Sequence, residues 1–403
     1  MRILLSAFAY SPILGSECGV GWHWARVLAQ HHDVTVLTHA WFREDVERAL
    51  AEQPQPRLNV VYFTVDPWLG QFSRPLLDSQ LYYVWWQWKV VPFARELHAQ
   101  MQFDVVHHLT WGSLRYPSWL GRIGARFIVG PLGGGERAPA RFFAGLPLKE
   151  RLKEVLRDAV LYSFKLDPFT QRALSKAERI FSRTQDTARF LPQYLSRKTT
   201  VAHEIGAPLV KTRPVRERRK TTTFLFAGRL IPFKGLHLAL PAIAEAVRQG
   251  ADVRLVAVGD GPLRDFLLAQ AARLGLGDRF DLRDRIPQAE LMDLYLDSDA
   301  FLFPSLHDSG GTVVLEALSR GLPVICLDLG GPACFVDDAC GVVVSTQGRS
   351  QAELVMALAD AVVAHARRSD PDRLAMCVAA AARATRLSWE KQVESVYGAL
   401  DDR

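Results

Sequence analysis

Two carboxylates lie on either side of a glycine pair in the stretch "HDSGGTVVLE", residues 307–316. They are Asp308 and Glu316. The apolar run before this stretch, "AFLFPS", predicts a buried strand, and the run after it predicts a helix that ends near Gly321. We expect Thr312 to be the N-cap of that helix, because Thr accepts hydrogen bonds from the first free amides. The stretch is therefore a strand-to-helix loop with an acid at each end.

The start of this predicted helix suits a phosphate with hydroxyl groups on both sides. The amides that follow Ser309, at Gly310, Gly311 and Thr312, would form an anion site at the positive end of the helix. Glu316 lies one turn further on the same face, where it would repel phosphate but accept hydrogen bonds from the vicinal hydroxyls of a ribose. Asp308 would face whatever lies beyond the phosphates. The spacing indicates a nucleotide sugar; a loop acid and a solvated helical Glu are the alternative.

A second loop places two cations between a strand and a helix. In "FLFAGRLIPFKGL" the strand ends at Gly228, Arg229 follows, and Lys234 comes just before Gly235. Two cations on one such loop suit a doubly charged group such as a diphosphate. An ordinary solvated turn is the other interpretation.

A third glycine loop, "SPILGSECGVG", follows the first predicted strand. Gly15 and the glycines after it would let the backbone approach a ligand at a helix N-terminus. The spacing is not G-x-G-x-x-G, and the second strand ends in "LTHA", without an acid to hold a ribose. A nicotinamide site is therefore disfavoured, and a loop whose glycines serve only packing stays open.

Strands alternate with helical stretches in both halves of the chain, which is typical of parallel sheets covered by helices. The N-terminal half has predicted strands at 2–8, 33–38, 58–65, 103–109, 126–130, 177–183 and 199–205. The second half has them at 222–228, 253–259, 279–284, 300–305 and 323–328. We predict an α/β fold of two doubly wound, Rossmann-like domains facing each other across a cleft. The domains are 1–206 and 223–387, with a Pro- and Arg-rich linker at 207–222 and a final helix at 388–403.

The charge of the chain is unevenly distributed. The net charge is +6, and residues 1–200 contain 25 Lys and Arg against 17 Asp and Glu. The same half contains the aromatic stretch "LYYVWWQWKVVPF", residues 81–93. Basic and aromatic residues together suit an anionic membrane surface, a nucleic acid, or simply solvated helix faces. The absence of a recognised nucleic-acid motif disfavours the second of these.

The remaining composition favours a protein of the reducing cytoplasm. The five cysteines, Cys18, Cys326, Cys334, Cys340 and Cys377, are scattered and odd in number, which disfavours a disulfide framework and a zinc site. No apolar run reaches 18 residues, so we expect no membrane-spanning helix. The N-terminus, "MRILLSAFAYSP", predicts a first strand and not a signal peptide.

Several motifs together resemble one enzyme family. The stretches "FAGRLIPFKGL", "VGDGPL", "PSLHDSGGTVVLEALSRGLPVI" and "SWEKQVESVYGAL" are similar to the C-terminal half of the family-4 (group 1) retaining glycosyltransferases, which have the GT-B fold. The stretches "GSECGVGWHWARVLA" and "VGPLGGGERAP" resemble the N-terminal half of polysaccharide-assembly members of that group. The resemblance spans nearly the whole chain.

The resemblance implies roles for residues of the donor site. The family's signature is a Glu, seven residues, and a second Glu. The second maps onto Glu316, on the donor ribose, and the first onto Asp308, a departure that is one methylene shorter and leaves the donor sugar in question. Arg229 and Lys234 match the cations that neutralise the diphosphate. Further donor contacts are implied for Gly259 in "VGDGPL" and for Arg283, whose segment, 282–290, would frame the base.

The acceptor side is implied by the N-terminal motifs. In "FDVVHHLTWGS", His107 and His108 end a strand where the family often has a functional His. The usual His-x-His spacing would put the second at Leu109, so the choice between the two stays open, and paired His in a strand are more often structural. The other candidates, in a glycine nest or at the start of the first helix, are Glu17, Gly134, Gly135 and Glu136.

These features predict transfer of a sugar from a nucleotide diphosphate sugar to a hydroxyl of a saccharide or lipid-linked saccharide. Retention of configuration is implied by the resemblance alone. Two cations and a helix dipole would make a metal ion unnecessary, and no other cofactor is expected. The chain would work in the cytoplasm, with peripheral contact to the inner face of an anionic membrane and no nucleic-acid partner. An epimerase of the same architecture and a non-catalytic nucleotide-sugar-binding subunit are the alternatives.

Overall fold

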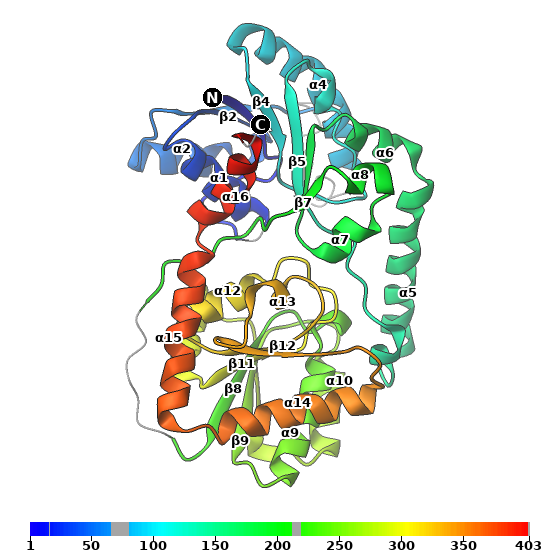
Figure 1. Ribbon diagram of the computed structural model, residues 1–403, viewed down its shortest axis with the longest axis vertical. Coiled ribbons are helices and arrows are strands. Elements are labelled where there is room, and N and C mark those ends of the chain that lie inside the picture. Colours follow the sequence, from blue (N-terminus) through cyan, green and yellow to red (C-terminus); the bar gives the residue numbers. More distant parts are fainter. Residues whose placement is uncertain (16, 66–79, 212–218, 402–403) are drawn as a thin grey trace. The chain divides into compact units, whose positions relative to one another are not determined.

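A computed structural model describes residues 1–401 except 16, 66–79 and 212–218 (Figure 1). The chain divides into two compact units. Unit 1 comprises Met1–Gly135, Ala159–Ile205 and Trp389–Arg403, and unit 2 comprises Glu136–Asp158 and Gly206–Ser388. Each unit is built around its own parallel sheet.

Unit 1 has a seven-stranded sheet in the order β3-β2-β1-β4-β5-β6-β7, with every neighbouring pair parallel. The strands are β1 (Arg2–Ser6), β2 (Asp33–Thr38), β3 (Leu58–Tyr62), β4 (Val105–His108), β5 (Arg126–Leu132), β6 (Arg179–Ser182) and β7 (Thr199–Val201). Each coincides with a predicted strand. The central strands are buried almost throughout, because helices cover both faces of a doubly wound sheet.

The helices described in unit 1 and around it are α1 (Glu17–Leu28), α2 (Arg43–Glu52), α4 (Gln80–Met101), α5 (Leu148–Ser163), α6 (Pro168–Ser175), α7 (Gln185–Phe190), α8 (Gln193–Ser196) and α16 (Trp389–Asp401). The last helix, α16, packs against α1. Trp389 stacks on His23 with ring centroids 4.4 Å apart, and the Tyr397 hydroxyl lies 3.0 Å from Nδ1 of His107. The end of the chain thus completes the core of unit 1.

The aromatic stretch at 81–93 lies in α4 and belongs mainly to the core of unit 1. Tyr83 and Trp86 are fully buried, and Phe8 of the β1 end lies 5.0 and 5.2 Å from their rings. Trp88 and Leu81 of the same stretch are exposed. Tyr83 and Trp86 therefore supply buried apolar area and are not available to a membrane-facing surface.

Unit 2 has a six-stranded sheet in the order β10-β9-β8-β11-β12-β13, again with every neighbouring pair parallel. Its strands are β8 (Thr222–Ala227), β9 (Val253–Val258), β10 (Phe280–Arg283), β11 (Ala300–Phe303), β12 (Val324–Leu327) and β13 (Gly341–Val344). The sequence predicted all of them except β13. Both sheets wind outward in two directions from a first strand, so the predicted α/β, doubly wound fold class is confirmed.

The helices of unit 2 are α9 (Leu236–Arg248), α10 (Arg264–Arg273), α11 (Gln288–Asp297), α12 (Thr312–Ser319), α13 (Pro332–Phe335), α14 (Gln351–Ala366) and α15 (Asp370–Arg386). Helices α9, α10 and α14 form one layer, and α11, α12, α13 and α15 form another (Figure 1). The helices fall into two layers because right-handed crossovers on the two sides of β8 place them on opposite faces of the sheet. Across the described residues, no helix combines the length and the apolar character needed to span a bilayer.

The unit boundaries differ from the predicted domains at one segment. Residues 136–158, expected in the N-terminal domain, group with unit 2, so α5 begins in unit 2 and ends in unit 1. Of the predicted linker at 207–222, residues 212–218 lie outside the described residues. Ala207 pairs with Ser388, and β8 already begins at Thr222.

Candidate active site

The donor candidates of unit 2 follow the carboxyl ends of its parallel strands. Strand order reverses between β8 and β11, since the chain winds from β8 to β9 and β10 on one side and from β11 to β13 on the other. In open α/β sheets, the loops at the carboxyl ends of the two strands that flank such a reversal form the ligand site. Here these are the loop 228–235 after β8 and the loop 304–311 after β11.

An ion pair joins these two loops. Nζ of Lys234 contacts Oδ2 of Asp308, and Oδ1 of Asp308 accepts a hydrogen bond of 3.3 Å from the amide of Gly310. Burial raises the pKa of the Asp308 carboxyl, but the Lys234 charge and the amides of Gly310 and Gly311 outweigh it and hold that pKa below its usual value. A carboxylate thus lies at the start of α12, where the sequence predicted an anion site.

Close backbone contacts fix the same loops. Gly235 has φ of 78°, and a Cβ there would lie 1.8 Å from the carbonyl oxygen of Pro304. On the far side, the amide of Gly331 donates to the carbonyl of Asp308 at 2.7 Å, and a Cβ on Gly330 would lie 2.4 Å from the same oxygen. Only glycine fits these approaches. The "GG" at 330–331 was visible in the sequence, but nothing there connected it to the donor loop.

The N-cap of α12 differs from the prediction. Gly311, with φ of 67°, is the cap, and Thr312 is the first helical residue. A Cβ on Gly311 would come within 3.2 Å of the Phe335 ring, so the chain uses glycine in the left-handed region instead of a hydroxyl cap. The amides of Gly310 and Gly311 are partnered by the Asp308 carboxylate.

Glu316 is buried and held by α11. Nε2 of Gln288 donates to Oε1 at 2.8 Å, and the Tyr295 hydroxyl donates to Oε2 at 3.1 Å. Burial raises the pKa of the Glu316 carboxyl, and the hydrogen bonds from Gln288 and Tyr295 offset this only in part. The sequence placed Gln288 in the segment expected to frame the base, but it gave no indication of Tyr295. Each oxygen keeps acceptor capacity for a ligand hydroxyl.

The other donor candidates lie at the ends of β8, β9 and β10. The amide of Gly228 donates to the carbonyl of Val258 at 3.0 Å, and the amide of Gly259 donates to the carbonyl of Arg283 at 3.1 Å. The backbone of Gly228 approaches Gly259 so closely that a Cβ on the latter would lie 1.9 Å from the carbonyl oxygen of the former. The side chain of Arg283 pairs with Asp281 at 2.8 Å, and Arg229 is exposed.

A histidine–glutamate contact supports the loop after β11. Nε2 of His307 lies 2.8 Å from Oε2 of Glu154, and its ring stacks on Phe233 with centroids 4.2 Å apart. The amide of Leu306 also donates to the carbonyl of Phe233 at 2.7 Å. Glu154 belongs to α5, more than 150 residues earlier in the chain, and no sequence signal linked it to this loop.

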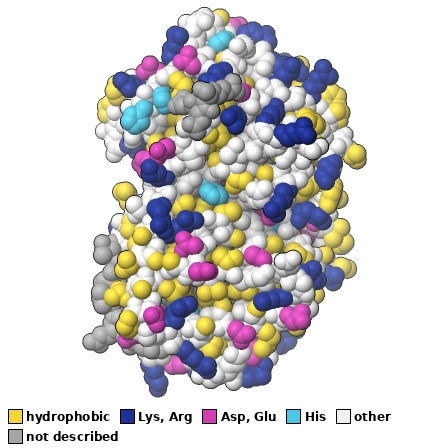
Figure 2. Space-filling view, in the orientation of Figure 1, with side chains coloured by type: hydrophobic (Ala, Val, Ile, Leu, Met, Phe, Trp, Pro, Cys, Tyr) yellow, Lys and Arg dark blue, Asp and Glu magenta, His cyan; other side chains and the backbone are white. Residues whose placement is uncertain are grey.

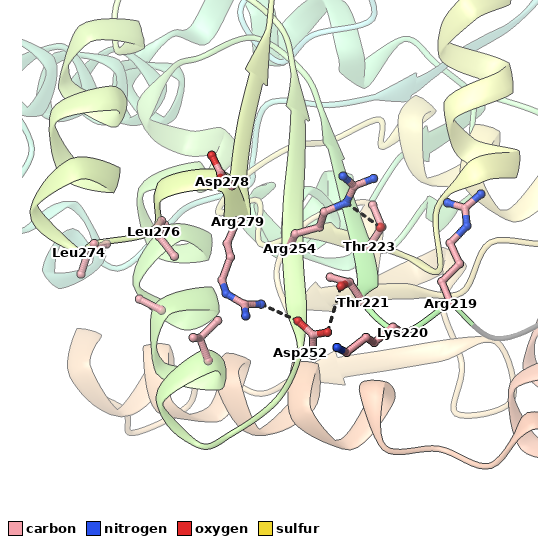
Figure 3. A pocket seen from close by; sticks show the side chains of 13 residues that line it. Arg219, Lys220, Thr221, Thr223, Asp252, Arg254, Leu274, Leu276, Asp278 and Arg279 are labelled. Carbon is pink, nitrogen blue, oxygen red and sulfur yellow. Dashed lines mark hydrogen bonds and ion pairs between the residues drawn. The ribbon is translucent and has the colours of Figure 1, made fainter.

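A cavity of about 750 Å³ lies elsewhere in unit 2, at the amino ends of its strands. Figure 3 shows Arg279 and Thr221 directed at Asp252, and Arg254 at Thr223. These contacts join the strand ends opposite to the donor loops. The cavity is therefore not the donor site.

An Asp-x-Asp sequence at 297–299, a pattern that can hold a divalent ion, also lies at the amino end of β11. Asp299 accepts a hydrogen bond of 2.8 Å from the amide of Thr223 and pairs with Arg373 at 3.2 Å. Its carboxylate therefore tethers β8 and α15 together. The Asp-x-Asp sequence therefore lies at the opposite ends of the strands from the expected donor site.

The acceptor candidate Glu17 lies at the corresponding reversal point of unit 1, between β1 and β4. It begins α1, its Oε2 accepts a hydrogen bond of 3.0 Å from the amide of Trp111, and its Oε1 pairs with Arg183 at 2.8 Å. Gly15, the donor candidate in the same loop, is exposed, with open space where a Cβ would be. Gly15 thus belongs to unit 1, whereas the other donor candidates belong to unit 2.

The glycine nest at 133–135 is already engaged within the protein. The amide of Gly133 donates to the carbonyl of Gly112, and the amide of Gly135 donates to Oγ1 of Thr187, both at 3.0 Å. Gly134 has φ of 103°, and Glu136 is 1% exposed. The amides at 133 and 135 therefore serve the fold in this arrangement, and the Glu136 side chain is buried.

Both candidate histidines are buried in β4. His107 contacts the Tyr397 hydroxyl through Nδ1 and the carbonyl of Gly130, at 2.7 Å, through Nε2; His108 contacts the Tyr83 hydroxyl at 3.2 Å. Burial lowers the pKa of His107 to about 4 and that of His108 to about 3. Both imidazoles are therefore neutral near pH 7.

Comparison with known proteins finds similarity mainly in the C-terminal part of the chain. Residues 211–371 match the family model for glycosyl transferases group 1. The D-inositol 3-phosphate glycosyltransferase of Segniliparus rotundus is 35% identical over 179 residues, which cover 42% of this chain and 38% of that protein. The chain spans about half, or less, of the length of the curated relatives it matches.

Solved structures resemble the chain over its full length. Sucrose-phosphate synthase from Thermosynechococcus elongatus has a TM-score of 0.62 at 17% identity, covering 99% of this chain and 98% of that one. HepE from Anabaena, solved with UDP and glucose, has a TM-score of 0.57 at 16% identity, covering 100% of both chains. The two doubly wound sheets are those of the GT-B fold. The match to the glycosyl transferases group 1 model, residues 211–371, includes the Lys234–Asp308 pair and Glu316.

Proposed function

We propose that this chain transfers a sugar from a nucleotide diphosphate sugar to a hydroxyl of a saccharide or lipid-linked saccharide. One observation carries the proposal: Lys234 and the start of α12 converge on a single anionic group, the Asp308 carboxylate, at the reversal point of the unit 2 sheet. This is the location where such sheets bind nucleotides. The match of residues 211–371 to the model for glycosyl transferases group 1 also supports the proposal.

The donor diphosphate competes with Asp308 for the same partners. A diphosphate carries more negative charge than one carboxylate, so Lys234 and the Gly310 amide turn to the phosphates when the donor binds. Asp308 is thereby released and accepts hydrogen bonds from the hydroxyls of the donor sugar. Glu316, fixed by Gln288 and Tyr295, holds the ribose hydroxyls on the other side of the phosphates.

The reaction needs stabilisation of the departing diphosphate. Negative charge grows on the leaving diphosphate as positive charge develops at the anomeric carbon. Arg229 and Lys234 stabilise the negative charge of the diphosphate.

With two cations and a helix N-terminus available, we infer that transfer needs no metal ion and no other cofactor. We infer retention of configuration from the motifs of residues 211–371. The chain works at the cytoplasmic side of a membrane that carries its acceptor.

Titration of the protein with UDP, GDP, ADP and dTDP, followed by hydrolysis of the matching nucleotide sugars, tests the donor site. UDP is included because the Anabaena structure contains it. We expect one nucleotide to bind well, and Arg229→Ala to slow hydrolysis of its sugar conjugate by about 10²–10³-fold, the usual effect of removing a donor to a developing anion. Lys220→Ala, an exposed cation at the opposite strand ends, is the matched control.

Removing Lys234 alone leaves the half-buried Asp308 carboxylate without its cation, which threatens folding. The Lys234→Met, Asp308→Asn double variant keeps the site neutral, so a folded protein without hydrolysis supports the assignment. Normal rates for Arg229→Ala or for the double variant would disprove it. Tight nucleotide binding without hydrolysis, or without transfer to any saccharide or lipid-linked acceptor, would identify a non-catalytic binding subunit instead.

A further inference from the structure

Helix α5 carries an exposed apolar strip in unit 2. Leu148, Leu152, Val155 and Leu156 are 68%, 57%, 63% and 65% exposed. At about 100° per residue, their spacing places all four on one side of the helix. Figure 2 shows hydrophobic and basic side chains together along the edge of the molecule where Figure 1 draws α5.

The acidic residues of α5 lie on the opposite side. Glu150, Glu154 and Asp158 follow one another at intervals of four, so they share one face. Glu150 is buried and pairs with Lys153 at 2.6 Å, Glu154 contacts His307 at 2.8 Å, and Asp158 pairs with Arg157 at 3.0 Å. Each carboxylate is thus directed toward the protein or is bound by a cation.

The exposed side of α5 is consequently apolar and cationic. Lys149 and Lys153 border the strip on one flank and Arg151 borders it on the other, and all three are exposed. Between residues 148 and 172, a segment described in full, every Asp and Glu is buried or half-buried. A helix with an apolar strip between basic flanks is suited to lie in the interface of an anionic lipid bilayer.

We propose that the outer face of α5, defined by Leu148, Leu152, Val155 and Leu156 with Lys149, Arg151 and Lys153, docks on an anionic lipid surface. The proposal goes beyond sugar transfer and does not depend on it. The apolar side chains enter the headgroup–acyl boundary, while the flanking cations contact lipid phosphates.

A second copy of the chain is a poorer occupant of this face. A two-fold contact would place the same patch against itself, and the cations that border the strip would then repel one another. Anionic lipid instead complements both the apolar and the cationic parts. The aromatic residues of α4 cannot supply this contact through Tyr83 and Trp86, because both are fully buried.

Co-sedimentation of the full chain with lipid vesicles tests the proposal. We expect binding to phosphatidylcholine vesicles that contain one quarter phosphatidylglycerol, and little binding to phosphatidylcholine alone. Leu152→Gln with Leu156→Gln should lower the partition coefficient by about tenfold or more, since two leucines lose their burial in lipid. Lys149→Gln with Arg151→Gln should lower it by about fivefold per cation and weaken its dependence on salt.

Leu374→Gln with Val378→Gln is the matched control, because these residues form an exposed apolar pair, also four apart, on α15. It should bind vesicles as the parent does, and circular dichroism should report the same helix content for all variants. The proposal is overturned if the parent binds no anionic vesicle, or if the Leu152–Leu156 variant binds unchanged. Self-association that this variant abolishes, without any binding to lipid, would assign the face to a second copy instead.

Discussion

Asp308 and Glu316 experience opposite electrostatic environments. Lys234 and two amides favour the charged form of Asp308 despite its burial, so its pKa is lowered. Glu316 receives hydrogen bonds from Gln288 and Tyr295, but burial dominates and its pKa is raised. A carboxylate kept buried at a cost in stability is typical of a group retained for binding. This contrast gives each acid a separate test.

Glu316→Gln should stabilise unit 2 at neutral pH while it weakens nucleotide binding. A carboxyl whose folded pKa is raised contributes its full stability below the unfolded value of 4.5 and loses it as pH rises through the folded pKa. The free energy of unfolding of the variant should therefore exceed that of the parent at pH 7, and the difference should narrow as pH falls through the folded pKa and stay constant below about 4.5. Urea titrations across this range measure it.

The same variant should bind its nucleoside diphosphate about 10–100-fold more weakly, because hydrogen bonds from ribose to a charged acceptor are lost. Calorimetric titration gives the affinity. Glu290→Gln, an exposed acid on α11, controls for the loss of one negative charge. Unchanged affinity in Glu316→Gln would remove Glu316 from the donor site.

At the scale of elements, the two glycines at the ends of α9 have similar backbone conformations, but only one of them has a close neighbour. Gly235 precedes the helix with φ of 78°, and Gly250 follows it with φ of 81°. Their backbone conformations are nearly identical, but their surroundings differ. A Cβ at 235 would collide with the Pro304 carbonyl, whereas a Cβ at 250 would have nothing within 4 Å.

Gly250→Ala should lower the free energy of unfolding by about 1 kcal/mol, the cost of a left-handed conformation in a residue with a side chain. Gly235→Ala should cost clearly more, about 3 kcal/mol or above, because the β8 and β11 loops must also separate. Urea denaturation of both variants gives the two values. Equal losses would mean that the contact of Gly235 with the Pro304 loop does not constrain the site.

The elements of the fold were largely predictable, whereas the contacts between them were not. Buried strands such as β8 and β11 are continuous apolar runs, so their sequence alone predicts them. The loops at 228–235 and 304–311 were likewise located by their glycines and charges. The cap of α12 was mispredicted, because the helix is capped by Gly311 in the left-handed conformation and not by a hydroxyl side chain. The contact of Glu154 with His307 joins distant segments, and no local pattern encodes it.

At the scale of the whole molecule, both units contain buried histidines with lowered pKa values. Burial lowers the pKa to about 4 for His39 and His107 and to about 3 for His108 in unit 1. It lowers the pKa to about 4 for His237 and His365 in unit 2. Protonation of any of them requires exposure to water, so acid should destabilise both units.

The free energy of unfolding should be full above about pH 6.5 and fall as pH drops toward 4, because these histidines gain protons more readily when unfolded. Urea midpoints at pH 7, 6 and 5 measure the decline. His108→Phe should make this loss of stability with falling pH smaller for unit 1. Its Nδ1 has no hydrogen-bond partner, and the Tyr83 hydroxyl keeps Gln87 and the Thr110 carbonyl. His31→Gln, at an exposed site, should leave the decline unchanged; an equal effect of both variants would contradict this origin.

The noncontiguous composition of unit 2 determines how the chain can be recombined with its relatives. Residues 136–158 are inserted within the sequence of unit 1, yet Phe142 accepts a hydrogen bond from His237 at 2.8 Å and Arg141 donates to the carbonyl of Thr346 at 3.2 Å. A chimera that exchanges residues 206–388 alone would combine a foreign donor half with a native segment that evolved to pack against another surface. To exchange donor specificity, residues 136–158 and 206–388 should therefore be replaced together.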